Sequence, residues 1–528
     1  MSTIADLPFL SAERFGSEPA LQYRSDEGWS QQSFSELADV VQDIALGLAA
    51  SGVGPGDRVC ILAETTPAWT HAGLAVLAAG AVVVPIYATS SAEECAWVIE
   101  DSGAQLVLCA SDLMSRLPPD ARVLSLESGL SSLASRGRAE GDPAELDRRR
   151  KAVQASDTAL IIYTSGTTGR AKGCLLTHRN WLRVCELTEE LNYIRHHDVV
   201  YLFLPLAHVF AQMVQFASVS IGATLVFWGG DVTRIVPELA EVRPTFFPSV
   251  PRIFEKVHAA LMASGAPPEA LYDKTRAIFG GRLRQALSGA APIAQEVIEF
   301  FHAAGVPLLE GYGLTETTGV GTVNTISSYR PGSVGMPVPQ VELRLASDGE
   351  IEMRGPHVFG GYWNNPAATA EVLSADGWFS TGDLGAIDDD GFVRITGRKK
   401  DIIVTAGGKN ISPANLENDL RQSPWISHAV VYGDRRPYPV ALITLDADTV
   451  PAWAAASGVS VPSPEVEALI TSVVESVNAR YSKASQIKRF AILDQDLTVE
   501  AGELTPSLKI KRRVVADNHG SVIESLYT

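Results

Sequence analysis

The sequence predicts an α/β protein: a large N-terminal region of doubly wound sheets with a β-rich subdomain, and a small α+β C-terminal domain on a hinge. Three observations support this prediction. The 528 residues of the chain exceed what one hydrophobic core usually supports. Helix and strand signals alternate through the N-terminal half, which is typical of parallel sheets covered by helices. Short runs separated by glycine and proline then replace this alternation.

The first α/β unit begins at Ser33, which fits a capping box together with Glu36. Apolar residues follow at helical spacing over 37–48 and predict a helix. The glycine-rich segment 52–57 ends that helix, and the apolar run 59–62 predicts a strand.

The alternation continues along the chain. Segment 72–88 is apolar, but Pro85 interrupts it and its order is helix then strand, so a buried crossover explains it better than a membrane span. Further buried, largely parallel strands are expected at 107–108, 159–162, 199–204, 224–227 and 245–247.

The pattern changes in the last third of the chain. Short runs over 330–354 predict the smaller β-rich part, and segment 378–401 is turn-rich and charged. A helix is expected to start at Ser412-Pro413, because proline is favoured in a first helical turn. We place a hinge near Lys400. The predicted domains are 1–399, a large N-terminal region, and 400–528, a small domain beyond the hinge.

Composition excludes several classes of protein. A net charge of −18 argues against a general nucleic-acid binder, because that affinity rests on neutralising phosphates with cations. The five cysteines show no spacing typical of zinc sites, which favours reduced thiols in the core. The N-terminal segment lacks the pattern of a secretory signal. We therefore expect a cytoplasmic protein without a transmembrane segment.

The loop 163–173, YTSGTTGRAKG, is the strongest local signal. It follows an apolar strand and combines flexible glycines with hydroxyl groups and a lysine, as a phosphate-binding loop requires. A Walker A loop needs a glycine directly before its lysine, and Ala171 occupies that position, so a P-loop NTPase is disfavoured. A plain surface turn is the alternative interpretation. The residues that would contact phosphate are Ser165, Gly166, Thr167, Thr168, Gly169, Lys172 and Gly173.

Five further segments follow this loop in order: LPLAHVF (204–210), EGYGLTET (310–317), STGDLG (380–385), GRKKDIIVTAGGKNISPANLE (397–417) and LTPSLKIKR (504–512). With the loop, they resemble the acyl-adenylate-forming superfamily, which includes acyl-CoA synthetases, peptide-synthetase adenylation domains and luciferases. The resemblance spans nearly the whole chain. The segments 246–258 and 435–445 are most similar to long-chain fatty acyl-CoA synthetases.

The resemblance implies a nucleotide site. It assigns Tyr312 to stacking on adenine, Thr315 to the α-phosphate and Glu316 to Mg²⁺, a cation that prefers carboxylate oxygens. In isolation this short segment would instead indicate a buried tyrosine in a tight turn with a solvated glutamate. The full set of nucleotide-binding residues implied is Thr164, Ser165, Gly166, Thr167, Thr168, Gly169, Lys172, Gly289, Ala290, Glu310, Gly311, Tyr312, Gly313, Asp383 and Arg398.

Three polar residues complete the implied site. Asp383 is an acceptor suited to the ribose hydroxyls, and Arg398 offers a planar fork of donors for ribose or phosphate. A turn aspartate and a surface salt bridge are the alternatives for these two. His208 by residue type alone reads as a core or helix-end histidine; the resemblance places it beside the acyl carboxylate, where we assign it to substrate positioning and not to proton transfer.

The catalytic lysine implied by the resemblance is Lys509, with Lys511 as the second choice. The family pattern has a glycine before this lysine, and Leu508 replaces it here, which puts the backbone freedom of the loop in doubt. The hinge residue, two places after Arg398, falls on Lys400. Rotation there would bring Gly407 and Gly408 toward the pantetheine of coenzyme A.

The implied reaction is ATP- and Mg²⁺-dependent activation of a hydrophobic carboxylic acid to acyl-AMP with release of pyrophosphate, then transfer to the thiol of coenzyme A. Gly319 and Gly321 could leave space for a long or bulky chain or could reflect tight packing. The alternatives are an acyl-AMP ligase that loads an acyl carrier protein, a CoA ligase for a polycyclic terpenoid acid, and a regulatory or scaffold protein with a decayed site. The expected oligomeric state is monomer or homodimer.

Overall fold

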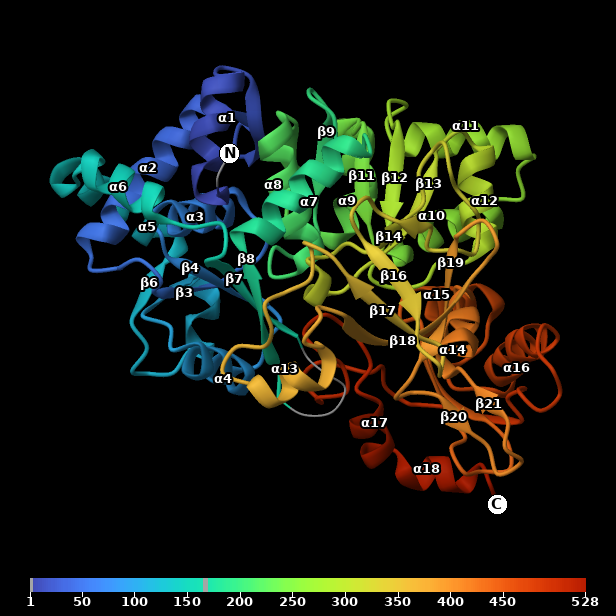
Figure 1. Cartoon of the computed structure of the whole chain (residues 1–528). Helices are drawn as coiled ribbons and strands as arrows, with labels where there is room; N and C mark the ends of the chain where they lie inside the picture. The colour runs from blue at the N-terminus through green and yellow to red at the C-terminus, as the bar shows by residue number, and fades with distance from the viewer. Residues whose placement is uncertain (1–2, 165–169) are drawn as a thin grey trace.

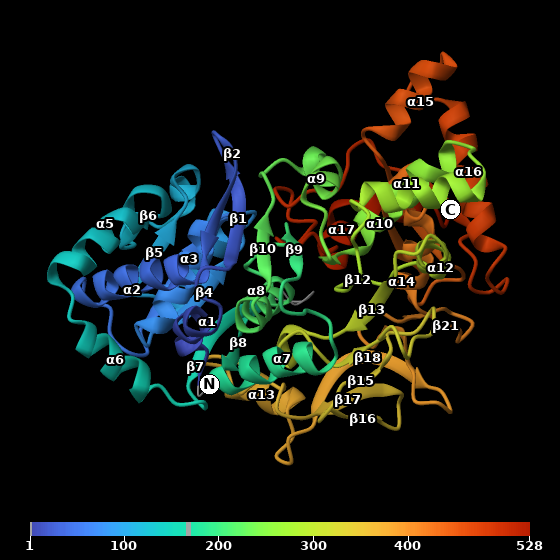
Figure 2. The same cartoon turned by 90° about the horizontal axis from the view of Figure 1, so that it is seen from above.

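The computed structural model describes residues 3–164 and 170–528 of the chain. It has the predicted organisation: two large sheets with helices, a smaller β-rich part and a C-terminal α+β part (Figures 1 and 2). Within the described residues, no helix combines the length and the hydropathy needed to cross a membrane. All five cysteines are buried and unpaired.

A six-stranded sheet lies in the N-terminal part of the chain, with strand order β6-β5-β3-β4-β7-β8. All neighbouring pairs are parallel except β7 with β8. Its strands are β3 (Arg58–Leu62), β4 (Val82–Ile86), β5 (Leu106–Cys109), β6 (Val123–Ser125), β7 (Thr158–Thr164) and β8 (Lys172–Thr177). Its helices are α2 (Phe34–Ala50), α3 (Pro67–Ala78), α4 (Ala92–Ser102), α5 (Leu126–Glu140) and α6 (Pro143–Ala152), with the 3-10 turn η2 (Ser111–Arg116).

Local signals account for these elements. The capping box predicted at Ser33 is present: its hydroxyl accepts from the backbone N–H of Glu36, and the Glu36 carboxylate accepts from the backbone N–H of Ser33. Segment 72–88 forms the end of α3 and the buried strand β4, so it is a crossover inside the protein, as predicted.

A nine-stranded sheet forms the centre of the molecule, with order β15-β14-β13-β12-β11-β9-β10-β1-β2. Strands β1 and β9 to β13 pair in parallel, and the strands at both edges pair antiparallel. Its strands are β1 (Pro19–Ser25), β2 (Gly28–Ser33), β9 (Val199–Leu202), β10 (Thr224–Phe227), β11 (Phe246–Ser249), β12 (Gln285–Ser288), β13 (Leu308–Tyr312), β14 (Thr322–Val323) and β15 (Met336–Pro337).

Helices cover both faces of this sheet. One core cluster joins the two large sheets and includes Val59 of β3, Trp69 of α3, Leu202 of β9 and Phe216 of α8. The opposite face packs against aromatic residues of the later helices, among them Phe254. The helices are η1 (Ile4–Asp6), α1 (Leu7–Phe15), α7 (His178–Glu190), α8 (Val209–Ile221), η3 (Val232–Arg234), α9 (Ile235–Val242), α10 (Pro251–Ala263), α11 (Pro268–Ile278) and α12 (Gln295–Ala303).

The β-rich part is an antiparallel sheet of order β16-β17-β18-β19. The strands are β16 (Glu342–Leu345), β17 (Glu350–Arg354), β18 (Phe379–Ile387) and β19 (Val393–Arg398), with helix α13 (Pro366–Val372) beside them. The turn-rich expectation for 378–401 is therefore wrong for most of that segment. Its glycines and charges lie in two paired strands, because the hydrogen-bonded partner strand supplies the order that local propensity does not.

The C-terminal part begins after β19 and contains a two-stranded and a three-stranded sheet. A helix starts at Pro413 with Ser412 at its N-cap, as predicted, although the serine side chain makes no capping hydrogen bond. The elements are β20 (Ile403–Val404), β21 (Asn410–Ile411), α14 (Pro413–Arg421), β22 (Ile426–Tyr432), β23 (Val440–Leu445), α15 (Thr449–Ser457), α16 (Pro464–Asn478), β24 (Arg489–Ile492), α17 (Arg512–Asn518) and α18 (Gly520–Ser525).

Polar contacts join the C-terminal part to the rest of the molecule. The guanidinium of Arg252 lies 3.0 Å from the carboxylate of Asp446. The hydroxyl of Thr89 donates to the carbonyl of Pro506 at 2.7 Å. The first contact joins the C-terminal part to α10, and the second holds the segment 504–511 against the N-terminal part.

Candidate active site

The predicted site residues lie at the carboxyl ends of the central parallel strands, where open α/β sheets bind ligands. Gly289 and Ala290 directly follow β12, and Tyr312 ends β13. The 3-10 turn η4 (Thr315–Thr317) places Thr315 and Glu316 just beyond it. Gly313 must be glycine here, since a Cβ would lie 2.4 Å from the carbonyl oxygen of Gly319.

Glu310 differs from its neighbours. Its side chain is buried, burial raises its pKa to about 8, and the backbone N–H of Ile293 lowers it in part. The cavity beside this strand is lined by Gly311, Tyr312 and Gly313, and Glu310 is absent from that lining. Three of the motif residues, Gly311, Tyr312 and Gly313, therefore line the cavity, and Glu310 does not.

Tyr312, Asp383 and Arg398 form one hydrogen-bonded group. The Tyr312 hydroxyl donates to Asp383 Oδ2 at 2.6 Å, and Arg398 Nε donates to Asp383 Oδ1 at 3.0 Å. Asp383 and Arg398 face each other in register across β18 and β19. Because an ionised carboxylate has about four lone-pair sites, Asp383 can accept two more hydrogen bonds, as a ribose diol would require.

A second group surrounds Glu316. The Tyr362 hydroxyl donates to Glu316 Oε1 at 2.8 Å. The ammonium of Lys172 lies 4.3 Å from the centroid of the Tyr362 ring, a cation–π geometry. One aromatic side chain thus positions both the carboxylate proposed for the metal and the lysine proposed for phosphate. The carboxylate is a hard oxygen donor of the kind Mg²⁺ prefers, so the residues present fit that ion.

The sequence analysis missed Tyr362. The bond to Glu316 spans 46 positions in the chain, and the segment FGGYWNN carries no spacing that singles out its tyrosine.

The loop predicted to bind phosphate is described only at its ends. Strand β7 ends at Thr164, which pairs with Lys172 at the start of the antiparallel strand β8. Ser165, Gly166, Thr167, Thr168 and Gly169 lie outside the described residues. The expectation that Gly173 supplies special backbone angles is wrong: it lies within β8, and a Cβ there would meet Ile161 at 2.6 Å. Its role is close packing between adjacent strands.

Lys509, and not Lys511, reaches this site. Neighbouring protein atoms displace part of its water and lower its pKa; the Arg398 guanidinium adds to this effect, and the carboxylates of Asp383 and Glu316 oppose it. The ammonium of Lys511 instead pairs with Glu94, 3.4 Å away.

The backbone before Lys509 is strained. Leu508 has φ of 61° and is 62% exposed. This left-handed conformation suits glycine, the residue that the family pattern has at this position.

His208 is the N-cap of α8, so the helix-end interpretation is confirmed. Its Nδ1 accepts from the backbone N–H of Phe210 at 3.1 Å. Burial and the charge of Lys509 lower its pKa to about 3. The imidazole is therefore neutral with its proton on Nε2, a donor that can orient a carboxylate but not an acid or base near neutral pH.

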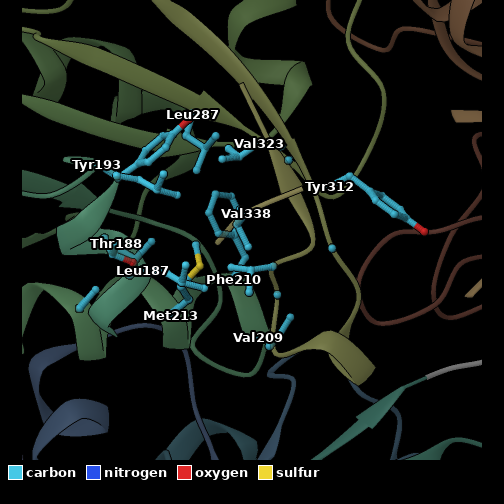
Figure 3. A pocket seen from close by; sticks show the side chains of 18 of the residues that line it. Leu187, Thr188, Tyr193, Val209, Phe210, Met213, Leu287, Tyr312, Val323 and Val338 are labelled. Carbon is cyan, nitrogen blue, oxygen red and sulfur yellow. The ribbon is translucent and has the colours of Figure 1, made fainter. Parts of the chain in front are cut away.

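An apolar cavity opens from this group and runs along α8 (Figure 3). Its volume is about 80 Å³, and most of its lining is apolar. Figure 3 shows Tyr312 on one side of the cavity and Tyr193, Leu187 and Thr188 on the opposite side. His208 also lines the cavity. Along α8 the lining residues are Val209, Phe210, Met213, Val214 and Ala217.

The two glycines near the cavity have different roles. Gly319 lines the cavity, as one reading of the sequence had it. Gly321 is not among the lining residues. A Cβ there would lie 2.7 Å from the side chain of Met353, so tight packing, the second interpretation, explains this glycine.

Comparisons with known proteins show the family of the chain. The model of the family described as AMP-binding enzyme matches residues 9–363, and the model of its C-terminal domain matches residues 400–528. The long-chain-fatty-acid–CoA ligase FadD15 of Mycobacterium bovis is 41% identical, covering 95% of this chain and 93% of the relative. The chain belongs to the AMP-binding enzyme family.

Solved structures share the fold of this AMP-binding enzyme. O-succinylbenzoate coenzyme A synthetase from Bacillus subtilis, in complex with AMP, has a TM-score of 0.77 at 24% identity, covering 96% of this chain and 97% of that one. The A domain of a carboxylic acid reductase from Segniliparus rugosus has a TM-score of 0.82 at 21% identity, with coverages of 99% and 94%.

The predicted hinge lies between two anchored segments of the AMP-binding enzyme. The ammonium of Lys399 lies 2.5 Å from Asp348 and 2.8 Å from Glu350 of the β-rich sheet. Ile403 belongs to the core of the C-terminal part. Lys400 is exposed in the turn that joins them.

The glycines predicted to bind coenzyme A lie apart from the nucleotide group in this arrangement. Gly407 and Gly408 are exposed in the turn between β20 and β21. Gly408 has φ of 77°, and no atom lies within 4 Å of a Cβ built on it. The described cavity along α8 does not include them.

Proposed function

We propose that this AMP-binding enzyme activates a long-chain or similarly hydrophobic carboxylic acid with ATP and Mg²⁺ and transfers the acyl group to coenzyme A. The observation that supports this most is the apolar cavity whose lining includes His208 and Tyr312, the latter a member of the group proposed to hold the nucleotide. The 41% identical relative named as a long-chain-fatty-acid–CoA ligase supports the same substrate class.

In the first step the carboxylate attacks the α-phosphorus of ATP; the bond to the β-phosphate oxygen breaks, and pyrophosphate leaves. The protein chiefly positions the reactants and stabilises charge. Tyr312 stacks on adenine, and Asp383 with Arg398 binds the ribose. Gly289 and Ala290 line the adenine pocket, and Thr315 donates to the α-phosphate.

Charge on the phosphates is balanced by three groups. Lys172 and the loop 164–169 hold the β- and γ-phosphates. Lys509 bridges the acyl carboxylate and the α-phosphate. Mg²⁺, when bound by Glu316, offsets the remaining negative charge. The neutral His208 donates from Nε2 and orients the carboxylate.

In the second step the thiolate of coenzyme A attacks the acyl carbon and AMP leaves. We propose that 400–528 is a mobile domain that rotates at Lys400. The rotation removes Lys509 from the cleft and brings Gly407 and Gly408 to the pantetheine. The contacts of Arg252 with Asp446 and of Thr89 with Pro506 belong to the first arrangement and break on rotation.

A panel of fatty, aromatic and polycyclic acids, each incubated with ATP, Mg²⁺ and coenzyme A, tests this proposal. We expect AMP and thioester in equal amounts, with the highest kcat/KM for long-chain acids. Thioester formed on a phosphopantetheinyl carrier protein and not on free coenzyme A would show that the acceptor is a carrier protein. A higher kcat/KM for a polycyclic acid than for the fatty acids would show that the substrate class is polycyclic acids. Absence of acid-dependent ATP–pyrophosphate exchange would indicate a binding protein and contradict the proposal.

A further inference from the structure

Two histidines and a glutamate gather on the outer surface, away from the nucleotide group. Glu18 lies in the connection between α1 and β1, and His196 and His197 lie in the connection between α7 and β9. Glu18 Oε2 is 2.8 Å from His196 Nε2 and 3.2 Å from His197 Nδ1. These three atoms all lie within 4.8 Å of one another.

The surrounding structure holds both imidazoles in place. The ring of His196 packs against that of Phe15, with centroids 4.9 Å apart, and stacks on His197 at 3.7 Å. Gly222, at the C-cap of α8, leaves room for His196, since a Cβ there would lie 2.7 Å from the imidazole. The backbone N–H of His197 donates to the carbonyl of Gly222 at 3.1 Å.

The backbone of the histidine connection is also constrained. His197 adopts the left-handed conformation with φ of 65°, which costs free energy for a residue other than glycine. The adjacent turn is closed by a hydrogen bond from the backbone N–H of Arg195 to Asp198 Oδ2 at 2.8 Å. Asp198 is itself paired with Arg284 at 2.6 Å. The histidines therefore stand on a rigid turn and not on a loose loop.

We propose that Glu18, His196 and His197 form a binding site for one divalent transition-metal ion of the Zn²⁺ class. Two imidazole nitrogens and one carboxylate oxygen are a donor set that Zn²⁺ accepts at about 2.0–2.2 Å. In a tetrahedral site with these bond lengths the ligand atoms lie about 3.3–3.6 Å apart. Binding therefore replaces the hydrogen bond between Glu18 and His196 and needs only a small movement from the present 2.8 Å and 3.2 Å. Imidazole donors select against Mg²⁺, which prefers oxygen ligands.

The position of the site suggests what the metal does. Tyr193 and Ile194, three and two positions before His196, line the apolar cavity. A metal bound here ties that segment to the connection between α1 and β1. It acts as a cross-link, which stabilises the folded protein when the unfolded chain binds the ion more weakly.

Calorimetric titration of the untagged full-length chain with Zn²⁺, in the presence of excess Mg²⁺, tests the proposal. We expect one Zn²⁺ per chain. Among residues 3–164 and 170–528, no second group of three such side chains meets the same geometry, so the stoichiometry is diagnostic. The substitutions Glu18→Gln, His196→Phe and His197→Asn should each weaken binding by at least about 10–100-fold, the loss typical of removing even an outer-shell partner.

Each substitution keeps the local structure. Phenylalanine preserves the ring contact with Phe15, and asparagine tolerates the left-handed backbone at position 197. His519→Gln is the matched control, because His519 pairs with Glu503 at 2.9 Å without a second imidazole; it should leave Zn²⁺ binding unchanged.

A measurement on the unmodified chain covers the case in which a variant does not fold. The X-ray absorption spectrum of the Zn²⁺-loaded protein should show two imidazole ligands. No Zn²⁺ binding by the unmodified chain, equal binding by the folded variants and the control, or a spectrum with fewer than two imidazoles would each overturn the proposal.

Discussion

Substituting Ala217 with leucine should shorten the range of acids that the enzyme uses. Ala217 lines the apolar cavity nine positions along α8 from His208. At a rise of about 1.5 Å per residue, these nine positions span about 13.5 Å. An extended chain advances about 1.2 Å per bond, from the ~3.6 Å that a residue spans over three bonds. About eleven bonds therefore fit between the carboxylate and Ala217.

Each methylene that enters the cavity contributes about 0.8 kcal/mol, which is about fourfold in kcat/KM. In the unmodified enzyme this gain continues for chains that pass Ala217 toward Leu187 and Leu191. In Ala217→Leu the gain should stop near dodecanoic acid. The assay is kcat/KM for saturated acids from octanoic to octadecanoic acid, with thioester quantified.

Ala211→Leu is the control for this experiment. Ala211 is buried in the same helix but does not line the cavity. Overpacking costs about 1–3 kcal/mol of stability at either position, but only Ala217→Leu should change the dependence on chain length. Parallel dependence in all three proteins would refute the assignment of this cavity to the acyl chain.

Three further substitutions test single interactions. Tyr362→Phe removes the hydrogen bond to Glu316 and keeps the aromatic ring beside Lys172. It should raise the Mg²⁺ concentration needed for half-maximal adenylation about tenfold, since a hydrogen bond to a charged group contributes about 1.5–3 kcal/mol. An unchanged Mg²⁺ requirement would contradict the positioning role of Tyr362. Leu508→Gly should raise the free energy of unfolding of the C-terminal part by about 1 kcal/mol in chemical denaturation, because it removes the strain of a non-glycine residue in the left-handed conformation. A loss of stability would show that the contacts of the leucine side chain outweigh this strain. Burial raises the pKa of Glu310 to about 8 in the folded protein, so between its unfolded pKa and about 8 the folded state binds more protons, and stability falls as pH rises through that range. Glu310→Gln should flatten this fall in thermal unfolding measured from pH 5 to 8. An identical slope in both proteins would argue against this role of Glu310.

The sequence predicts the elements whose signals are local. The capping box at Ser33 and the apolar runs of β3 and β10 are visible in a few consecutive residues. The strands β18 and β19 are not, because their glycines and charges resemble turns. They become strands through pairing, and that pairing places Asp383 opposite Arg398. Order that arises from a partner strand leaves no signal within one strand.

The same distinction holds for the site. The motif residues Tyr312, Glu316 and Asp383 lie within recognisable segments, and the structure gathers them. Tyr362 contacts Glu316 and Lys172 through the fold alone, and the cavity lining on α8 is an ordinary apolar helix face in the sequence. Residues of this kind require the packing of distant elements to be known.

The rates of the two half-reactions in Lys509→Ala test most directly the claim that Lys509 acts in adenylation and not in thioester formation. Acyl-AMP formation from hexadecanoic acid and ATP should fall by about 10²–10³-fold, the loss typical of removing one group that stabilises charge in the transition state. Conversion of supplied hexadecanoyl-AMP and coenzyme A to thioester should proceed at the unmodified rate, because the proposed rotation removes the lysine from the cleft before this step. Lys511→Ala, whose ammonium pairs with Glu94, should leave both rates near those of the unmodified enzyme. Equal losses in the two half-reactions of Lys509→Ala, or ADP in place of AMP as the product, would contradict the account.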